Sequence, residues 1–321
     1  MLRAARRVKH RALLAGYDLR AEAQAIGVRT RSRAVLRDAA RQLDLPTLPR
    51  STGSVWAVAM VRDEQDVLGG TIRQLLTQGV DHVLVVDNLS GDGTGDLLAD
   101  LAAQGSVHAG RDRSTAYRQA ATMTLLMDAA RAAGARWVVP FDADERWMGK
   151  KRPLAEVLRS TSAPMVRAEL VNAFPDPVRK DEWRLDPAPH PDPKIAVRPR
   201  RRTTLQMGNH GALRSGSVAE GLGIVHLPWR SYAQFRAKVR HGAQALAEAG
   251  AAPDAGWHWQ RLGAMEEEEL MLTWRRLLAG LPVPENAWHP GPVTVPFPLD
   301  EPMTWDAVLR ARSRPTPRGS W

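Results

Sequence analysis

Short apolar runs alternate with helix-like segments through the first half of the chain. The clearest runs are rich in valine, as expected for strands buried on both faces, and occupy residues 55–61, 83–86 and 137–141. A shorter run is expected at 106–109. Segments of helical character lie between the runs, at residues 65–78, 94–103 and 115–133. This alternation predicts an α/β fold, a mostly parallel, Rossmann-like sheet with helices on both faces.

The pattern weakens beyond residue 150. Short strands are expected at residues 165–172, 194–197, 205–207 and 223–226. Ser231 can cap a helix that continues to residue 249, and one further helix is expected over 257–279, ended by Gly280. Residues 175–202 are rich in Pro, Asp and Arg and predict a long loop or an elaborated insertion. The last forty residues show no clear period.

Positive charge is concentrated at the start of the chain. Residues 1–50 hold twelve Lys or Arg against four Asp or Glu, whereas the whole chain has a net charge of +10. This segment predicts a basic helical extension that either lies on an anionic membrane surface or packs on the main domain. Because the remainder is nearly neutral, we expect no nucleic-acid partner. The chain is therefore expected to have three parts: the basic extension with its linker at residues 1–50, a main domain at 51–245, and a helical and proline-rich segment at 246–321.

Composition excludes several other classes of protein. The chain has no cysteine, which excludes disulfides and thiolate metal sites. It has no apolar run long enough to cross a membrane and no apolar stretch typical of a secretory signal. We therefore expect a cytoplasmic protein, with peripheral contact at the inner face of the membrane through residues 1–50.

Three carboxylates follow the run at 137–141 within four positions. Asp142 and Asp144 are two residues apart and would point the same way on an extended chain, with Glu145 next to them. Such oxygen donors at a strand end suit Mg²⁺ or Mn²⁺, which in turn suits a diphosphate. The alternative is a solvated turn or a helix N-cap.

Several short motifs, in this order, resemble a family-2-type glycosyltransferase. The closest resemblance is to a bacterial subgroup with an Asp-Ala-Asp-Glu motif, and it covers roughly residues 55–245. The motifs that carry it are Val61-Arg62-Asp63-Glu64, Val86-Asp87-Asn88-x-Ser90-x-Asp92-Gly93-Thr94, Tyr117-Arg118-Gln119, Phe141-Asp142-Ala143-Asp144-Glu145, Gly208-Asn209-His210 and His226-Leu227-Pro228-x-Arg230-Ser231.

The resemblance implies a GT-A fold, a nucleoside diphosphate sugar donor linked to UDP or GDP, and Mn²⁺ or Mg²⁺. Residues 55–150 would bind the nucleotide sugar and residues 151–245 the acceptor, a glycan, lipid or protein. Implied metal ligands are Asp142, Asp144 and His226, with His210 as a rival for the histidine. Implied donor-binding residues are Arg62, Glu64, Asp87, Asn88, Arg118 and Asp142, and Lys194 or Arg230 could contact phosphate. Structural roles remain open for these residues, such as an Asx-turn at Asp87 or a helix N-terminus at Glu64.

The catalytic base is not identified by any motif. An inverting enzyme needs a carboxylate near the acceptor hydroxyl, and the candidates are Glu169, Asp176, Asp181 and Glu182. A nucleotidyltransferase is disfavoured because residues 62–65 contain no glycine for a phosphate-binding loop. The other alternative is a non-catalytic adaptor, built on a degenerate glycosyltransferase domain and docked through residues 1–50.

Overall fold

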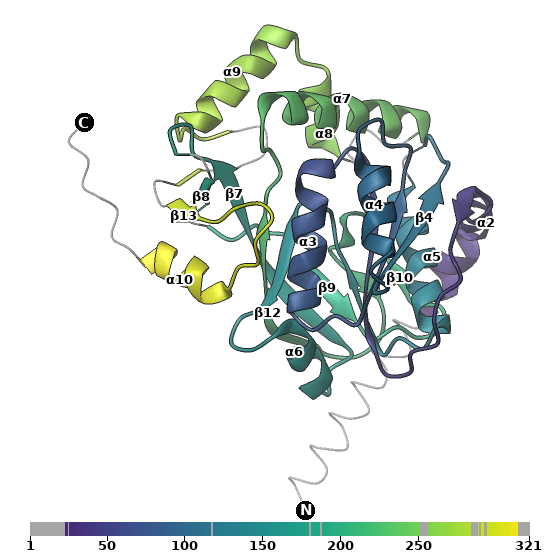
Figure 1. The fold of residues 1–321 in the computed structure, drawn as a ribbon. Coiled ribbons are helices and arrows are strands. Elements are labelled where there is room, and N and C mark those ends of the chain that lie inside the picture. Colours follow the sequence, from purple (N-terminus) through teal and green to yellow (C-terminus); the bar gives the residue numbers. More distant parts are fainter. Residues whose placement is uncertain are drawn as a thin grey trace, which may run out of the picture.

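The computed structural model describes residues 23–313, apart from residues 25, 117, 180, 187, 251–255, 284–287, 289, 292 and 293. Residues 1–22, which include the first part of the predicted N-terminal helix, lie outside the described residues. One large sheet runs through the molecule, and helices cover both of its faces (Figure 1). The predicted α/β architecture is confirmed.

Within the described residues the large sheet has eleven strands. Its main path runs β1-β4-β3-β2-β5-β9-β7-β12-β6, while β8 pairs with both β7 and β13. The strands are β1 (Leu43–Asp44), β2 (Val55–Val61), β3 (His82–Asp87), β4 (Val107–Asp112), β5 (Trp137–Pro140), β6 (Glu145–Gly149), β7 (Met165–Pro175), β8 (Glu182–Leu185), β9 (Lys194–Val197), β12 (Val218–His226) and β13 (Thr294–Pro296). A separate small sheet pairs β10 (Thr204–Leu205) with β11 (Ala212–Leu213).

Most helices occupy the connections between strands. They are α2 (Arg33–Gln42), α3 (Gln65–Thr77), α4 (Thr94–Ala102), α5 (Gln119–Ala132), α6 (Leu154–Ser160), α7 (Tyr232–Glu248), α8 (Trp257–Gly263), α9 (Glu267–Leu278) and α10 (Trp305–Ser313), with the 3-10 turn η1 (Met207–Asn209). The predicted N-cap of α7 is confirmed, since Ser231 Oγ accepts a hydrogen bond from the Gln234 amide at 3.2 Å.

The alternation of side chains along β2 explains why both faces are covered. Its odd-numbered residues, from Val55 to Val61, pack in the core beneath α3 and α4. Trp56 and Val58 point the other way and pack beneath α5. Every residue of this strand except Met60 is buried, which explains why its sequence is a continuous apolar run.

The strand order creates one special position at the sheet edge. Strands β4, β3, β2 and β5 are parallel neighbours, and the chain moves from β2 outward to β3 and β4 before it returns to β5 on the other side. The carboxyl ends of β2 and β5 therefore flank a topological switch point, where open α/β sheets form their binding crevice. Helix α7 crosses this end of the sheet, above α3 and α4 in Figure 1.

The described part of the N-terminal extension packs on the main domain. Strand β1 adds an antiparallel edge to β4, with Leu43 opposite Asp112. Arg29 forms an ion pair with Asp128 of α5 and donates to the Thr203 carbonyl at 2.7 Å. No described helix has the length and apolar composition needed to cross a membrane.

Three predictions about the second half were wrong. The single helix expected over 257–279 is divided into α8 and α9, because Glu266 and Glu269 form a capping box that starts a new helix. The segment 175–202 contains β8 in addition to the strand expected at 194–197, which is confirmed as β9. The strand expected at 205–207 ends at Leu205, where the chain turns into η1 with Gly208 at a φ of 72°.

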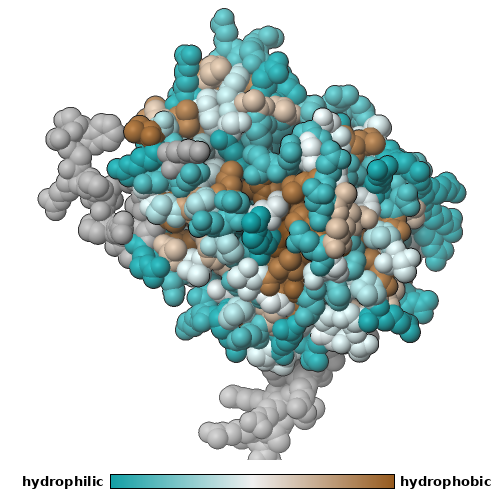
Figure 2. All heavy atoms as spheres, viewed as in Figure 1, coloured by the Kyte–Doolittle hydropathy of each residue, from teal (hydrophilic) through white to brown (hydrophobic). Residues whose placement is uncertain are grey.

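The C-terminal residues form part of the same core. Residues with no clear period in sequence form β13 and α10, and Trp305 and Val308 pack in the core beside α3 and β12. In the space-filling view of this face, apolar side chains gather toward the centre and hydrophilic ones cover most of the rest (Figure 2).

Candidate functional site

The loops after β2 and β3 are tied together at the carboxyl edge of the sheet. The Asp63 amide donates to Ser90 Oγ at 2.9 Å, and the Gly91 amide donates to Asp63 Oδ1 at 2.7 Å. The Glu64 amide donates to Thr94 Oγ1 at 3.0 Å. Since Thr94 begins α4, these bonds hold the first turns of α3 and α4 side by side at the switch point.

Asp142 lies just beyond β5, and three other elements hold its carboxylate. Lys194 Nζ of β9 lies 2.7 Å from Oδ2. Oδ1 accepts hydrogen bonds from the amides of Gln119 at the start of α5 and Asn209 in η1, at 3.2 and 3.1 Å. The Asp142 side chain is 29% exposed, so it is fixed and still reaches the surface of the site.

Glu145 is the first residue of β6 rather than part of an acidic turn. Lys194 bridges it to Asp142, with 2.9 Å between Nζ and Glu145 Oε1. Trp147 Nε1 and the Asp142 amide donate to Oε2 at 3.0 and 3.1 Å. Burial raises the pKa of Glu145. These contacts give Glu145 a supporting position beneath Asp142.

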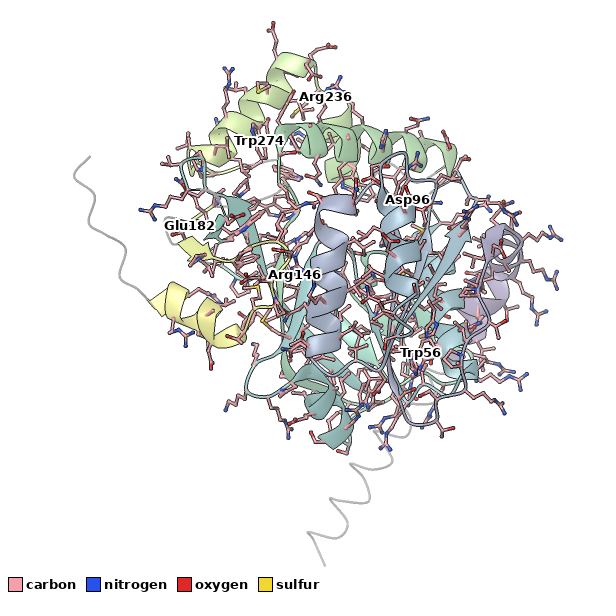
Figure 3. The ribbon with its side chains drawn as sticks, in the orientation of Figure 1. Trp56, Asp96, Arg146, Glu182, Arg236 and Trp274 are labelled. Carbon is pink, nitrogen blue, oxygen red and sulfur yellow. The ribbon has the colours of Figure 1, made fainter. Side chains whose placement is uncertain are left out.

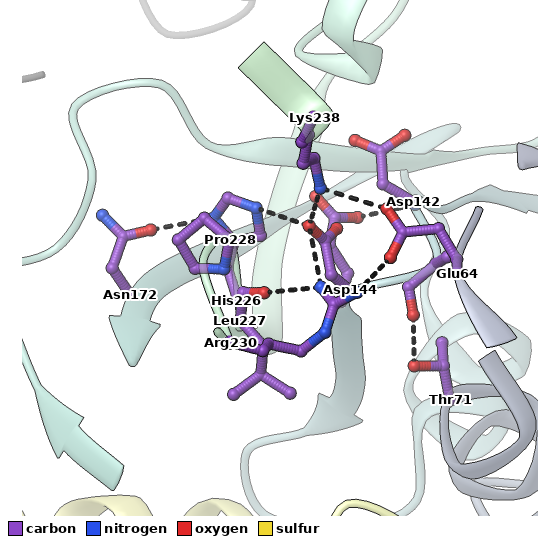
Figure 4. A network of polar contacts seen from close by, with 12 residues as sticks. Glu64, Thr71, Asp142, Asp144, Asn172, His226, Leu227, Pro228, Arg230 and Lys238 are labelled. Carbon is purple, nitrogen blue, oxygen red and sulfur yellow. Dashed lines mark hydrogen bonds and ion pairs between the residues drawn. The ribbon is translucent and has the colours of Figure 1, made fainter. Parts of the chain in front are cut away.

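Asp144 is a nearly inaccessible carboxylate surrounded by cations. Its side chain is 2% exposed, and Oδ2 accepts a hydrogen bond from Lys238 Nζ of α7 (Figure 4). His226 Nε2 lies 3.6 Å from the same oxygen and Arg230 Nη1 lies 4.0 Å from it. Burial acts to raise the pKa of Asp144, but Lys238, His226 and Arg230 hold it well below its usual value. Asp144 is therefore ionised at neutral pH.

Glu64 is joined to the same cluster through two cations. Arg230 Nη2 donates to Glu64 Oε2 at 2.5 Å, and Lys238 Nζ lies 3.1 Å from Oε1. The Arg230 guanidinium also binds both oxygens of Asp66, at 2.7 and 2.8 Å, in a bidentate arrangement. Arg230 thereby fastens the loop between β12 and α7 to the first turn of α3.

His226 is oriented by its neighbour in the sheet. It ends β12 opposite Asn172 of the parallel strand β7, and its Nδ1 lies 2.8 Å from Asn172 Oδ1. Nδ1 therefore donates to Asn172, and the other ring nitrogen, Nε2, is held facing Asp144.

The formal charges of this cluster suit a divalent cation. The carboxylates Glu64, Asp66, Asp142, Asp144 and Glu145 outnumber the cations Lys194, Arg230 and Lys238 by two. Asp144 Oδ2 and His226 Nε2 are close enough to share one ion, because two ligand atoms at about 2.1 Å from an ion lie up to about 4 Å apart.

The protein provides only part of such a coordination shell. Among the described residues, no three His, Asp or Glu side chains are placed to hold an ion. Both oxygens of Asp142 are already engaged, so it does not point at the position between Asp144 and His226. Mg²⁺ and Mn²⁺ are commonly bound by one or two protein ligands together with water and substrate phosphates. The two remaining ligands fit an ion that arrives with a diphosphate.

Two of the predicted donor-binding residues lie in the loop after β3. Asp87 Oδ1 accepts a hydrogen bond from the Ser90 hydroxyl, whereas in the Asx-turn considered from sequence a backbone amide would donate. Asn88 donates to the carbonyls of Asp112 and Ser114 at 3.2 and 2.7 Å, so its side chain supports the loop after β4.

The predicted arginines lie at the edge of the cluster. Arg62 is exposed, with its Nε 3.8 Å from Asp63 Oδ2. Arg118 precedes α5 and forms an ion pair with Asp38 of α2. Together with Gln119 it lines a cavity of about 490 Å³ between α2, α5 and η1. His210 lies near Asp142, and its Nδ1 lies 3.2 Å from the Pro193 carbonyl.

Three of the four candidates for catalytic base form ion pairs outside this cluster. Glu169 pairs with Lys150 and Arg312, at 2.5 and 2.9 Å. Asp176 pairs with Arg184 at 3.0 Å. Glu182 of β8 pairs with Arg179, and Asp181 precedes it with a φ of 61° (Figure 3).

Lys238 is the principal residue of the cluster that sequence reasoning missed. The signal is its position on α7, where Phe235, Val239, Gly242 and Leu246 are buried at helical spacing. Lys238 lies three residues after Phe235 on this buried stripe. A lysine on the buried stripe of a helix needs a partner of opposite charge, and here it has two.

A family comparison agrees with this geometry. Residues 57–213, just under half of the chain, match Glycosyl transferase family 2. This segment is therefore similar to a family 2 glycosyltransferase domain. The domain contains Glu64, Asp142 and Asp144, while His226, Arg230 and Lys238 follow it in sequence. The chain is accordingly an enzyme of the glycosyltransferase class, and its α/β architecture agrees with the predicted GT-A fold.

Solved structures give weaker similarities. Staphylococcus aureus TarS 1–349 in complex with UDP is 11% identical over 71% of each chain, with a TM-score of 0.37. The mannosyltransferase PcManGT from Pyrobaculum calidifontis, in complex with GDP-Man and Mn²⁺, is 14% identical over 83% of this chain and 88% of its own, with a TM-score of 0.38. Because both TM-scores are below 0.5, we draw no conclusion about the donor or the metal of this chain from these structures. No curated protein matches the chain.

Proposed function

We propose that the protein transfers a glycosyl group from a nucleoside diphosphate sugar to a glycan, lipid or protein acceptor, with Mg²⁺ or Mn²⁺ bound at Asp144 and His226. The observation that carries this proposal is the ionised, buried Asp144 at the switch point, with His226 Nε2 3.6 Å away. The match to Glycosyl transferase family 2 supports a role of Asp144 and His226 in holding the metal ion of a nucleotide-sugar donor. UDP- and GDP-linked sugars are the proposed donors, and assignment to the bacterial Asp-Ala-Asp-Glu subgroup is part of the same proposal.

The metal ion supplies Lewis-acid stabilisation of the negative charge on the departing diphosphate. The chain's own residues prepare the position. Asn172 keeps Nε2 of His226 directed at Asp144. Arg230 holds Glu64 and the start of α3 in place, and Lys194 holds Asp142 and Glu145 at a fixed separation. A site fixed before the donor arrives needs little rearrangement during the reaction.

Asp142 takes a different role from Asp144 in this proposal. Its partly exposed carboxylate, held by Gln119 and Asn209, can accept hydrogen bonds from sugar or ribose hydroxyls. Asp87, Arg62 and Arg118 surround the ends of the neighbouring strands and would contact the nucleotide. The acceptor hydroxyl would approach from the half formed by residues 151–245.

Turnover of sugar nucleotides tests the proposal. The purified protein is incubated with a panel of UDP- and GDP-linked sugars and Mn²⁺, and release of the nucleoside diphosphate is measured. We expect release from at least one donor and loss of at least about a hundredfold in Asp144→Asn. Full turnover by a folded Asp144→Asn variant would rule out the metal role of Asp144.

A further inference from the structure

Two cations would compete for one carboxylate oxygen, Oδ2 of Asp144. Asp144 Oδ2 faces the position proposed for the metal ion, and it already accepts a hydrogen bond from Lys238. Lys238 Nζ also lies 3.1 Å from Glu64 Oε1, so the ammonium bridges the two carboxylates (Figure 4). An ammonium and a divalent cation cannot occupy this small space together without strong repulsion.

The two cations beside Asp144 differ in how firmly they are held. Arg230 is 2% exposed and binds Glu64, both oxygens of Asp66 and the Leu227 carbonyl. Lys238 is 24% exposed and extends from α7 on a flexible stem with four carbons. Lys238 can therefore swing away while Arg230 stays in place.

We infer that Lys238 is an internal counter-cation that competes with the divalent ion for Asp144, so that the enzyme takes up metal together with the donor diphosphate. This inference rests on the proposed function. On arrival of a metal–diphosphate complex, Lys238 would leave the Asp144 oxygen, which would then help to hold the ion. The released ammonium then finds a new partner in the phosphate oxygens, which are strong acceptors. Lys238 acts as a positioning residue that links the two ligands.

The arrangement has a thermodynamic consequence. Without nucleotide, a metal ion must displace Lys238 and leave it without a compensating anion. With nucleotide, the diphosphate provides that anion. Metal and nucleoside diphosphate should therefore each increase the affinity for the other by the same factor. The absence of the lysine should remove much of this coupling.

Mn²⁺ titration of the full chain tests the inference without any turnover. Free Mn²⁺ is followed by electron paramagnetic resonance in wild type, Lys238→Met and Lys151→Met. The second variant is a matched control, because it removes the same charge from an exposed lysine in the loop before α6. We expect Lys238→Met to bind Mn²⁺ alone at least about tenfold more tightly than wild type. Lys151→Met should match wild type.

The same titration is repeated with UDP and GDP. In wild type, one nucleotide should raise the Mn²⁺ affinity at least about tenfold, and in Lys238→Met the rise should be smaller. This wild-type comparison still decides the matter if Lys238→Met fails to fold. Equal Mn²⁺ affinity with and without nucleotide, or no gain in folded Lys238→Met, would overturn the inference. If wild type binds neither Mn²⁺ nor nucleotide, the proposed function fails as well.

Discussion

Asn172 and His226 end neighbouring parallel strands, and Asn172 Oδ1 accepts a hydrogen bond from His226 Nδ1 over 2.8 Å. The bond fixes which ring nitrogen faces Asp144. An amide is a suitable partner because its oxygen accepts this hydrogen bond without adding another charge to the cluster. Residues that orient a metal-binding histidine in this way are nearly as important as the ligand itself.

Substitution of Asn172 should therefore weaken metal binding without touching the metal. In Asn172→Ala, His226 loses its orientation, and we expect Mn²⁺ affinity in the presence of nucleotide to fall about 10- to 100-fold. Asn172→Asp should restore part of the loss because it keeps an acceptor at the same position. Mn²⁺ titration measures both, and wild-type affinity in Asn172→Ala would contradict the role of the pair.

A buried arginine next to the cluster predicts a stabilising substitution. Arg146 follows Glu145 on β6, is inaccessible to solvent, and lies between α3 and the C-terminal segment (Figure 3). Its Nη2 donates to the Leu299 carbonyl, whereas Nε and Nη1 have no hydrogen-bond partner among the residues that the structure describes. Burial, together with Arg73 and Arg230, lowers the pKa of Arg146 to about 9. It is therefore charged at neutral pH at a cost to stability.

We expect Arg146→Met to leave the free energy of unfolding unchanged or to raise it by about 1–4 kcal/mol. Arg230→Met is the contrasting variant, because it removes a buried cation that pairs with both Glu64 and Asp66 and should lower the same quantity by about 3–5 kcal/mol. Urea unfolding at neutral pH compares them. A large loss of stability in Arg146→Met would mean that its guanidinium has a partner of opposite charge.

Two adjacent glycines of α3 test the packing of the C-terminal segment. A Cβ on Gly70 would lie 1.9 Å from the Leu299 carbonyl oxygen and 2.4 Å from Arg146 Nη2. A Cβ on Gly69 would lie no closer than 3.7 Å to any neighbour, Leu97. We expect Gly70→Ala to destabilise by about 1–3 kcal/mol through overpacking. Gly69→Ala should stabilise by up to about 1 kcal/mol through helix propensity. Equal thermal unfolding of the two variants would contradict this packing.

The amino end of the sheet predicts a pH dependence. His82 Nδ1 and His108 Nε2 lie 3.2 Å apart on β3 and β4, beside the ring of Trp56. Burial lowers the pKa of both imidazoles, with Asp81 partly opposing this at His82. The unfolded chain therefore binds more protons as the pH falls through about 6.5, and the free energy of unfolding decreases there.

Urea unfolding at about pH 7.5 and pH 5.5 measures this loss. In His108→Gln one of the two imidazoles is absent, and the decrease between the two values should be smaller than in wild type. An identical decrease in the variant would show that the acid sensitivity arises elsewhere.

The sheet was largely predictable because its strands carry a local signal. Strands β2, β3 and β5 are continuous apolar runs, and the parallel arrangement follows from the helices between them. The end of β5 could likewise be identified from Asp142 and Asp144. The start of β6 could not, because Glu145 looks like the third member of a polar turn until Lys194 and Trp147 are brought to it by the fold.

The partners of the carboxylates were less accessible to sequence reasoning. Lys238 reaches Asp144 across 94 positions, and Asn172 reaches His226 across 54. No local pattern encodes such pairs, since they depend on where α7 and β7 lie relative to β5 and β12. Arg230 is partly predictable. It belongs to a motif that is visible in the sequence, but its bidentate bond to Asp66 depends on the folded chain bringing α3 and α7 together.

Thermal unfolding with Mn²⁺ and nucleoside diphosphates tests directly whether the protein binds a metal–nucleotide complex through Asp144. The full chain is compared with Asp144→Asn and with Asp100→Asn, a control that removes an exposed carboxylate of α4. A ligand that binds only the folded state raises the unfolding temperature. We expect a rise that requires both Mn²⁺ and one nucleotide, persists in Asp100→Asn and is lost in Asp144→Asn. A rise of equal size in Asp144→Asn, or none in wild type with any nucleotide, would contradict it.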